Sequence, residues 1–164
     1  MKSKNTFKHT SDALQSKSRR DKCGVSRLSL STLKKRCWQQ FSLYIRMRDC
    51  LKTTGCSSFG LCVTCGKRYH IKLLQAGHFV SGRHNANLFS EEGVHGQCRS
   101  CNIWGHGNPL EYRRAIIDLY GDGYDEVLEK EAREIKKYTI DDYKEIEETY
   151  KNKYQELLDN YNKR

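Results

Sequence analysis

Two Cys-x-x-Cys pairs in the middle of this 164-residue chain constrain its fold more than any other feature. The first pair runs from Cys62 to Cys65, and the second runs from Cys98 to Cys101. Four thiolates in two such turns can converge on one tetrahedral zinc ion, with Zn–S distances of about 2.3 Å. The spacing therefore predicts a zinc site with these four ligands. An ion with four thiolates has no open position for water, so we expect it to be structural rather than catalytic.

The chain has eight cysteines, which would also suit a disulfide scaffold. However, its first residues contain no apolar stretch typical of a signal peptide, and no run approaches the length of a membrane span. We therefore expect a reducing compartment, where paired cysteines more often bind metal. Cys37 falls in an apolar helical stripe, which predicts a core position. A second metal held by Cys50 and Cys56 is the weaker alternative, because no matching pair lies nearby in the sequence.

The charge of the chain is unevenly distributed. Residues 1–60 contain 14 Lys and Arg against 3 Asp and Glu, whereas residues 121–164 contain 9 against 13. A basic first half is typical of a protein that binds a polyanion, most simply nucleic acid. A basic tail that only improves solubility is the alternative.

Composition and periodicity divide the chain into four segments. Residues 1–26 form a basic arm that buries too little apolar surface to offset the entropy of ordering, so we expect it to be disordered. Residues 27–56 are predicted to contain a basic helix, 57–108 the zinc-bound core, and 109–164 the C-terminal helices. Together these predict an α+β protein, in which a small zinc core is flanked by helices.

The basic helix is predicted to start near Ser31 and to end before Gly55, because apolar residues recur at steps of three and four. Its basic residues are expected on the exposed face: Lys34, Lys35, Arg36, Arg46 and Arg48. The first three of these are candidates for DNA contacts.

Between the cysteine pairs, residues 69–73 and 74–80 are predicted to form a β-hairpin, followed by a polar loop over 81–93. A short helix is predicted to open at the second pair and to end at Gly105. Further helices are predicted over 109–120, 124–133 and 140–161. The last carries an apolar stripe of four tyrosines, Ile146 and Leu157, which indicates packing against the zinc core or, alternatively, a dimer seam.

His78 falls in the second expected strand, and Asn102 directly follows the last zinc-ligating cysteine. Because strand and helix are both tied to the zinc, we expect these two side chains to face each other. The arrangement resembles the HNH, or ββα-metal, nuclease motif. That resemblance implies that His78 deprotonates the attacking water and that Asn102 ligates a catalytic Mg²⁺ or Mn²⁺. A structural histidine, or one that contacts phosphate, is the alternative.

The resemblance extends along the chain. The runs that carry it are Gln75-Ala76-Gly77-His78-Phe79, Val94-His95-Gly96-Gln97-Cys98 and Gly107-Asn108. Over roughly residues 33–160 the chain looks like the phage recombination family NinG, also called Rap. The resemblance implies a treble-clef-like HNH core and a structure-specific endonuclease acting on Holliday junctions or D-loops. It also implies a bacterial cytoplasmic location, branched DNA and recombination proteins as partners, no membrane, and a homodimer as one option.

Two positions depart from the broader HNH pattern. Many HNH sites place Asp or His directly before the base and Asn five residues before the second cysteine pair, where this chain has Gly77 and Gly93. His95 is then the best candidate for a second catalytic and ion-ligating residue, with a phosphate contact as the alternative. The remaining candidates for DNA contacts are Arg83, Arg99 and Asn108.

The resulting prediction is a metal-dependent endonuclease that cuts branched DNA by water attack. A non-catalytic, zinc-stabilised DNA-binding module is the main alternative, and an RNA-directed nuclease is a weaker one.

Overall fold

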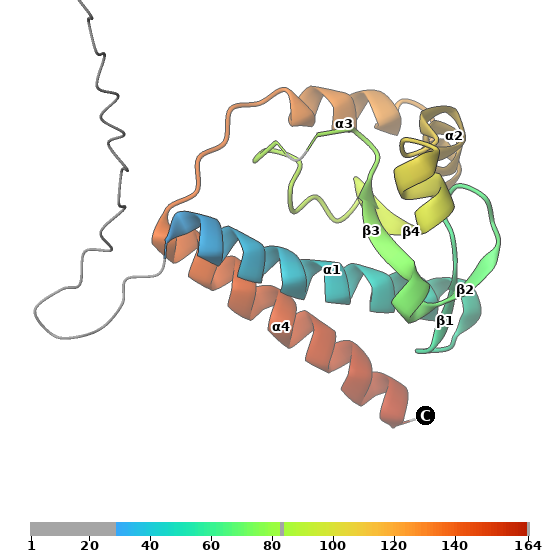
Figure 1. The fold of residues 1–164 in the computed structure, drawn as a ribbon, viewed down its shortest axis with the longest axis horizontal. Coiled ribbons are helices and arrows are strands. Elements are labelled where there is room, and N and C mark those ends of the chain that lie inside the picture. Colours follow the sequence, from blue (N-terminus) through green and yellow to red (C-terminus); the bar gives the residue numbers. More distant parts are fainter. Residues whose placement is uncertain (1–28, 83, 164) are drawn as a thin grey trace, which may run out of the picture.

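The computed structural model describes residues 29–82 and 84–163, so the arm over 1–26 and the disorder expected there lie outside the described residues. Two long helices, α1 (Leu30–Thr54) and α4 (Ile140–Asn162), lie side by side and run in the same direction (Figure 1). The strands labelled β3 and β4 and the two shorter helices lie on the other side of α1, and the strands labelled β1 and β2 lie at its C-terminal end. The core therefore lies along α1, between α4 and the strands.

Helix α1 begins and ends at clear capping residues. The side chain of Ser29 accepts a hydrogen bond from the backbone of Thr32, and Gly55 closes the helix with a left-handed φ of 68°. The predicted end is confirmed, and the helix starts at Leu30, one residue before Ser31. One face of α1 carries the apolar residues that recur at helical spacing, among them Phe41 and Ile45, which are fully buried.

Helix α4 begins with a capping box between Thr139 and Asp142, as its sequence predicts. Its stripe packs on α1: Tyr143 joins a buried cluster with Leu33 and Cys37, and Tyr150 joins another around Phe41. The thiol of buried Cys37 also donates to the Tyr143 carbonyl at 2.8 Å, which confirms its core position. The stripe therefore packs on α1 rather than on the four paired cysteines, while the dimer seam stays a prediction.

The strands pair differently from the predicted hairpin. Strand β1 (Phe59–Leu61) pairs with β2 (Arg68–His70), and β3 (Leu74–His78) pairs antiparallel with β4 (Val94–Cys98). A single 3₁₀ turn, η1 (Ile71–Leu73), separates β2 from β3, and the His70 side chain caps it. The predicted pairing of 69–73 with 74–80 is therefore wrong, because this turn redirects the chain and places β3 beside a strand from beyond the polar loop.

The remaining helices follow their predictions closely. A short π-helix, η2 (Ser100–Trp104), follows the second cysteine pair, and α2 (Pro109–Tyr120) and α3 (Tyr124–Ala132) come next. A buried cluster of Phe79, Tyr112, Ile116 and Leu128 fastens α2 and α3 to the end of β3. In the described part of the chain, no helix is long and apolar enough to cross a membrane.

Candidate functional site

The four predicted zinc ligands come together. The sulfur atoms of Cys62, Cys65, Cys98 and Cys101 all lie within 4.8 Å of one another. Zn–S bonds of about 2.3 Å place the sulfurs of a tetrahedral site a little under 4 Å apart, so the cluster fits one such ion. The turn between β1 and β2 supplies the first pair, and the junction of β4 with η2 supplies the second. The cluster can therefore hold a metal such as zinc and tie these elements together.

Local hydrogen bonds favour the thiolate form of Cys62, one of the four cysteines. The Cys62 sulfur lies 3.3 Å from both the Cys98 backbone nitrogen and the Thr64 hydroxyl. Burial opposes ionisation of the Cys62 thiol, but these hydrogen bonds outweigh it and lower its pKa to about 7. A thiolate is the form that binds zinc, so the surroundings of Cys62 favour the binding form.

Cys50 and Cys56 were the alternative candidates for a second metal site. Among the described residues, Cys50 and Cys56 belong to no cluster of three or more metal-ligating side chains. Cys50 is fully buried, and burial raises the pKa of its thiol to about 11. At neutral pH the Cys50 thiol therefore stays protonated, and its side chain packs in the core.

His78 is the last residue of β3, and its ring faces α1. It stacks on the ring of Trp38 with a centroid distance of 5.0 Å and an interplanar angle of 15°. Its Nε2 lies 3.4 Å from the carbonyl oxygen of Leu88. The stacking on Trp38 fixes the orientation of the ring.

Asn102 lies on the other side of β3. Its amide nitrogen donates to the side-chain oxygen of Gln75 at 2.8 Å, and its oxygen lies 3.0 Å from the point that a Cβ on Gly77 would occupy. Because side chains alternate along a strand, Gly77 faces η2 whereas His78 faces α1. His78 and Asn102 therefore flank the end of β3 and do not face each other, contrary to our expectation.

Oxygen atoms gather where a divalent ion could be held. Beside Asn102, the side-chain oxygen of fully buried Gln97 lies 2.0 Å from the same Cβ point of Gly77. Among the described residues, this oxygen has no hydrogen-bond partner. Amide oxygens are ligands that Mg²⁺ and Mn²⁺ accept, so the residues present fit the ion that the resemblance implies.

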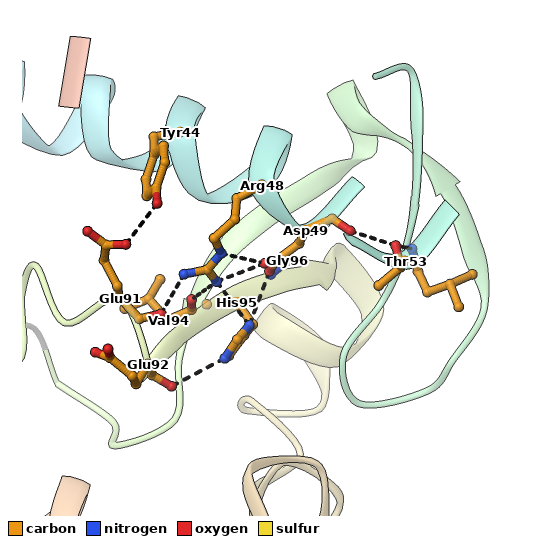
Figure 2. Close-up of polar contacts among 12 residues, drawn as sticks. Tyr44, Arg48, Asp49, Thr53, Glu91, Glu92, Val94, His95 and Gly96 are labelled. Atoms are coloured by element: carbon orange, nitrogen blue, oxygen red, sulfur yellow. Dashed lines mark hydrogen bonds and ion pairs between the residues drawn. The ribbon is translucent and has the colours of Figure 1, made fainter. Parts of the chain in front are cut away.

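His95 belongs to a buried polar network with Arg48 and Asp49 of α1 (Figure 2). Its Nδ1 lies 3.2 Å from the Asp49 carboxylate, and its Nε2 lies 3.2 Å from both the Glu92 carbonyl and the Tyr120 hydroxyl. His95 is only 5% exposed to solvent. Because both ring nitrogens already have partners in the protein, the arrangement does not favour His95 as a ligand of a catalytic ion.

Arg48 and Asp49 complete this network and join α1 to β4. The Arg48 guanidinium donates to Asp49, to the Glu91 carbonyl at 2.7 Å and to the Val94 carbonyl at 3.0 Å. Asp49 also accepts from the Gly96 backbone at 2.7 Å. Burial raises the pKa of Asp49, but hydrogen bonds and charge from His95 and Arg48 outweigh burial and lower it to about 2. The carboxylate is therefore charged and satisfied.

The buried position of Arg48 corrects our expectation of an exposed basic residue, since it is only 6% exposed. The sequence does carry a signal for it, because Arg48 continues the three- and four-residue spacing of Phe41 and Ile45. We had placed Arg48 on the exposed face of α1 because of its charge, whereas its spacing places it on the buried face.

The residues predicted to bind DNA lie on several elements. Lys34 donates to Asn85 at 2.8 Å, Arg36 pairs with Glu147 at 2.8 Å, and Lys35 is exposed on α1. Arg99 is exposed, with its guanidinium 5.6 Å from the centre of the Trp104 ring. Asn108 is the N-cap of α2, with a φ of 47°.

Arg83 lies outside the described residues. The left-handed backbone of Asn108 points to a turn-forming role, because asparagine tolerates this conformation better than most residues.

Comparison with known proteins supplies the family. Neither a search of curated proteins nor a search of solved structures found a match. A family model described as the Bacteriophage Lambda NinG protein matches residues 2–160, which is nearly the whole chain. The match spans the four-cysteine cluster, His78, Asn102 and the buried polar network, so this chain belongs to the NinG family.

Proposed function

We propose that this protein is a metal-dependent endonuclease that cleaves branched DNA, with His78 as its general base. The observation that carries the proposal is the end of strand β3. There a histidine held against Trp38 directly follows the glycine that faces Asn102. Because His78 is the last residue of the strand, a phosphodiester lying across this end can reach both sides of β3.

The chain's own groups perform the hydrolysis as follows. The imidazole of His78 accepts a proton from a water molecule, whose oxygen attacks the phosphorus in line with the 3′ oxygen. The bond between phosphorus and the 3′ oxygen breaks, and the leaving oxygen takes a proton from solvent. A divalent ion near Asn102, when bound, supplies positive charge that stabilises the transition state. The products carry a 5′-phosphate and a 3′-hydroxyl.

The substrate class rests on the family resemblance and on charge. The resemblance to the NinG family implies action on branched recombination intermediates. The first 60 residues also carry most of the excess positive charge of this chain. Exposed side chains such as Lys35 and Arg99 suit phosphate contacts, which position DNA without reading its sequence. Binding should then weaken steeply as the salt concentration rises.

The decisive experiment compares labelled four-way junction, flap and linear duplex DNA, each with Mg²⁺ or with EDTA. The wild-type protein should cut the branched substrates only with the ion, and His78→Ala should lose at least a hundredfold in rate. His106→Ala removes an exposed histidine and should retain the wild-type rate. Cleavage that persists in His78→Ala would remove this histidine from the role of base.

The same assay separates the alternatives. Binding to the junction without cleavage under any metal condition favours a zinc-stabilised DNA-binding module. Faster cleavage of an RNA junction of the same shape favours an RNA-directed nuclease. A second copy of the chain remains a proposed partner, because resolving a four-way junction needs two symmetric nicks. Binding of two protein copies to each junction, with cleavage of both symmetric strands, would support the dimer.

A further inference from the structure

Gln97 is the most deeply buried polar side chain near the end of β3. It lies on β4, directly before the zinc-ligating Cys98, and is 0% exposed. Its amide nitrogen donates to the Gly107 carbonyl at 2.9 Å, which fixes the orientation of the amide group. The oxygen then points toward Gly77, and it is one of two buried side-chain atoms without a hydrogen-bond partner in the part of the chain described.

The backbone of Gly77 shows how tightly this oxygen is placed. A Cβ built on Gly77 would lie 2.0 Å from the Gln97 oxygen and 3.0 Å from the Asn102 oxygen. Gly77 is absent from the positive-φ glycines, so its backbone conformation does not demand glycine. Space is the reason for glycine here, because any other residue would collide with the Gln97 amide.

Two amide oxygens therefore lie beside Gly77, 2.0 and 3.0 Å from the point that its Cβ would occupy, so they are at most 5.0 Å apart. The Asn102 amide nitrogen is engaged with Gln75, so its oxygen is the atom that faces this point. A buried acceptor without a partner is destabilising, because the hydration it loses on folding is not replaced. A divalent cation would satisfy both oxygens at once.

The four-cysteine cluster fixes both oxygens in place. Gln97 precedes Cys98 and Asn102 follows Cys101, so the second cysteine pair brackets the two amides in sequence. Metal bound at the cysteines would therefore hold the amides at a constant separation without taking part in the reaction. His95 cannot compete for this role, since both of its ring nitrogens face partners in the buried polar network.

We propose that Gln97 and Asn102 together hold the divalent ion of the nuclease site through their side-chain oxygens. The Gln97 oxygen then occupies the space of the side chain that Gly77 lacks, and it supplies from β4 a ligand that β3 does not. The inference rests on the proposed function only in assuming that a divalent ion is used. It assigns Gln97 to a role that its sequence position alone does not suggest.

The test measures Mn²⁺ binding to the zinc-loaded protein without DNA, by the loss of the free-ion signal in electron paramagnetic resonance. Gln97→Met keeps the side-chain volume and removes the oxygen, and Asn102→Ala removes the other ligand. Each should weaken Mn²⁺ binding at least tenfold at unchanged zinc content. Gln155→Met makes the same chemical change at an exposed position of α4, and this variant should bind Mn²⁺ as the wild type does.

A second variant guards against misfolding of Gln97→Met. Gln97→Glu places a carboxylate at the same point, so Mn²⁺ should raise its melting temperature more than that of the wild type. Mn²⁺ affinity unchanged in both Gln97→Met and Asn102→Ala would overturn the inference, as would a wild-type protein that binds no Mn²⁺ at millimolar concentration.

These outcomes are distinct from a failure of the proposed function. Cleavage that depends on His78, together with unchanged Mn²⁺ binding in Gln97→Met, would sink the ion-site inference and leave the nuclease proposal standing. Mn²⁺ binding that depends on Gln97, without cleavage of any DNA, would support the ion site and contradict the nuclease proposal.

Discussion

Strand β4 is held at its two ends by different chemistry. At its C-terminal end, Cys98 belongs to the four-cysteine cluster, which can hold a metal. At its N-terminal end, His95 and the backbone of Gly96 join Arg48 and Asp49 in the buried polar network (Figure 2). Both ends fix the same strand, which pairs with the strand carrying His78. The strand is therefore held at one end by a cysteine cluster that can coordinate a metal, and at the other by hydrogen-bonded charges.

The two solutions differ in what they require. A zinc site supplies folding free energy directly, because the ligands gather only in the folded chain. A buried ion pair returns little net free energy, since the loss of hydration offsets most of the attraction between its charges. Removing one partner is nevertheless damaging, because the other charge is then left buried and unsatisfied. The cluster should therefore decide whether the core folds, and the network should decide how firmly β4 is held to α1.

The largest effect is expected from Cys98→Ser. Structural zinc contributes about 10 kcal/mol or more to small zinc domains, which exceeds the total stability of many proteins. We expect the variant to lose its metal and the ordered β3–β4 pair, while α1 and α4 keep part of their helical signal. Zinc content by mass spectrometry and circular dichroism check this.

The control for the cluster is Cys56→Ser, which removes a half-buried cysteine outside it. This variant should keep its zinc and its melting temperature. A folded Cys98→Ser protein with wild-type stability would contradict the structural role of the metal.

A smaller effect is expected from Asp49→Ala. Arg48 and His95 would remain buried without their carboxylate, so the free energy of unfolding should fall by about 3–5 kcal/mol. Unlike the cysteine variant, this one should retain its zinc, because the cluster is formed by other residues. Urea denaturation with zinc content measured in parallel checks both expectations.

The outer contact of the network gives a graded comparison for this prediction. Tyr120→Phe removes only the hydroxyl that lies 3.2 Å from His95, and should lower the free energy of unfolding by about 1 kcal/mol. Equal losses in Asp49→Ala and Tyr120→Phe would show that the carboxylate is not the centre of the network.

The smallest effect is expected from pH. Because the pKa of Asp49 is lowered to about 2, its contribution is fully present above the unfolded pKa of about 3.9 and is lost as the pH falls toward 2. The stability advantage of the wild type over Asp49→Asn should therefore shrink by about 1 kcal/mol between pH 6 and pH 3.

Zinc release in acid affects wild type and Asp49→Asn alike, so the difference between their urea midpoints isolates the carboxylate. A difference that stays constant over this range would mean that Asp49 is not a charged member of the network.

The sequence was a good guide wherever the signal is local. The helices follow from periodicity and caps, such as Gly55 after α1 and the box at Thr139 before α4. The four cysteines follow from spacing alone. Strand β4 was not predicted, because its buried residues include the polar His95 and Gln97. Its sequence therefore lacks the alternation of apolar and polar residues that marks a strand. A buried polar strand resembles a loop until its hydrogen-bond partners are known.

The candidate site shows the same division. His78 and Asn102 were selected by their positions beside the cysteine pairs. His78 is the last residue of β3, and Asn102 approaches the opposite face of that strand from η2. The position of Gln97 beside Gly77 depends on which strands pair and in which register. No spacing rule reports that register, so this oxygen could not have been selected from the sequence.

The sequence by itself determined the four-cysteine cluster, which can hold a metal, and the helices of this protein, because both are signalled by residues a few positions apart. Only the tertiary structure decided that β3 pairs with β4, that Arg48 is buried, and that Gln97 meets Asn102 over Gly77. The physical reason is that such contacts join residues distant in the chain. Their free energy depends on burial and on partners that exist only once the chain has folded.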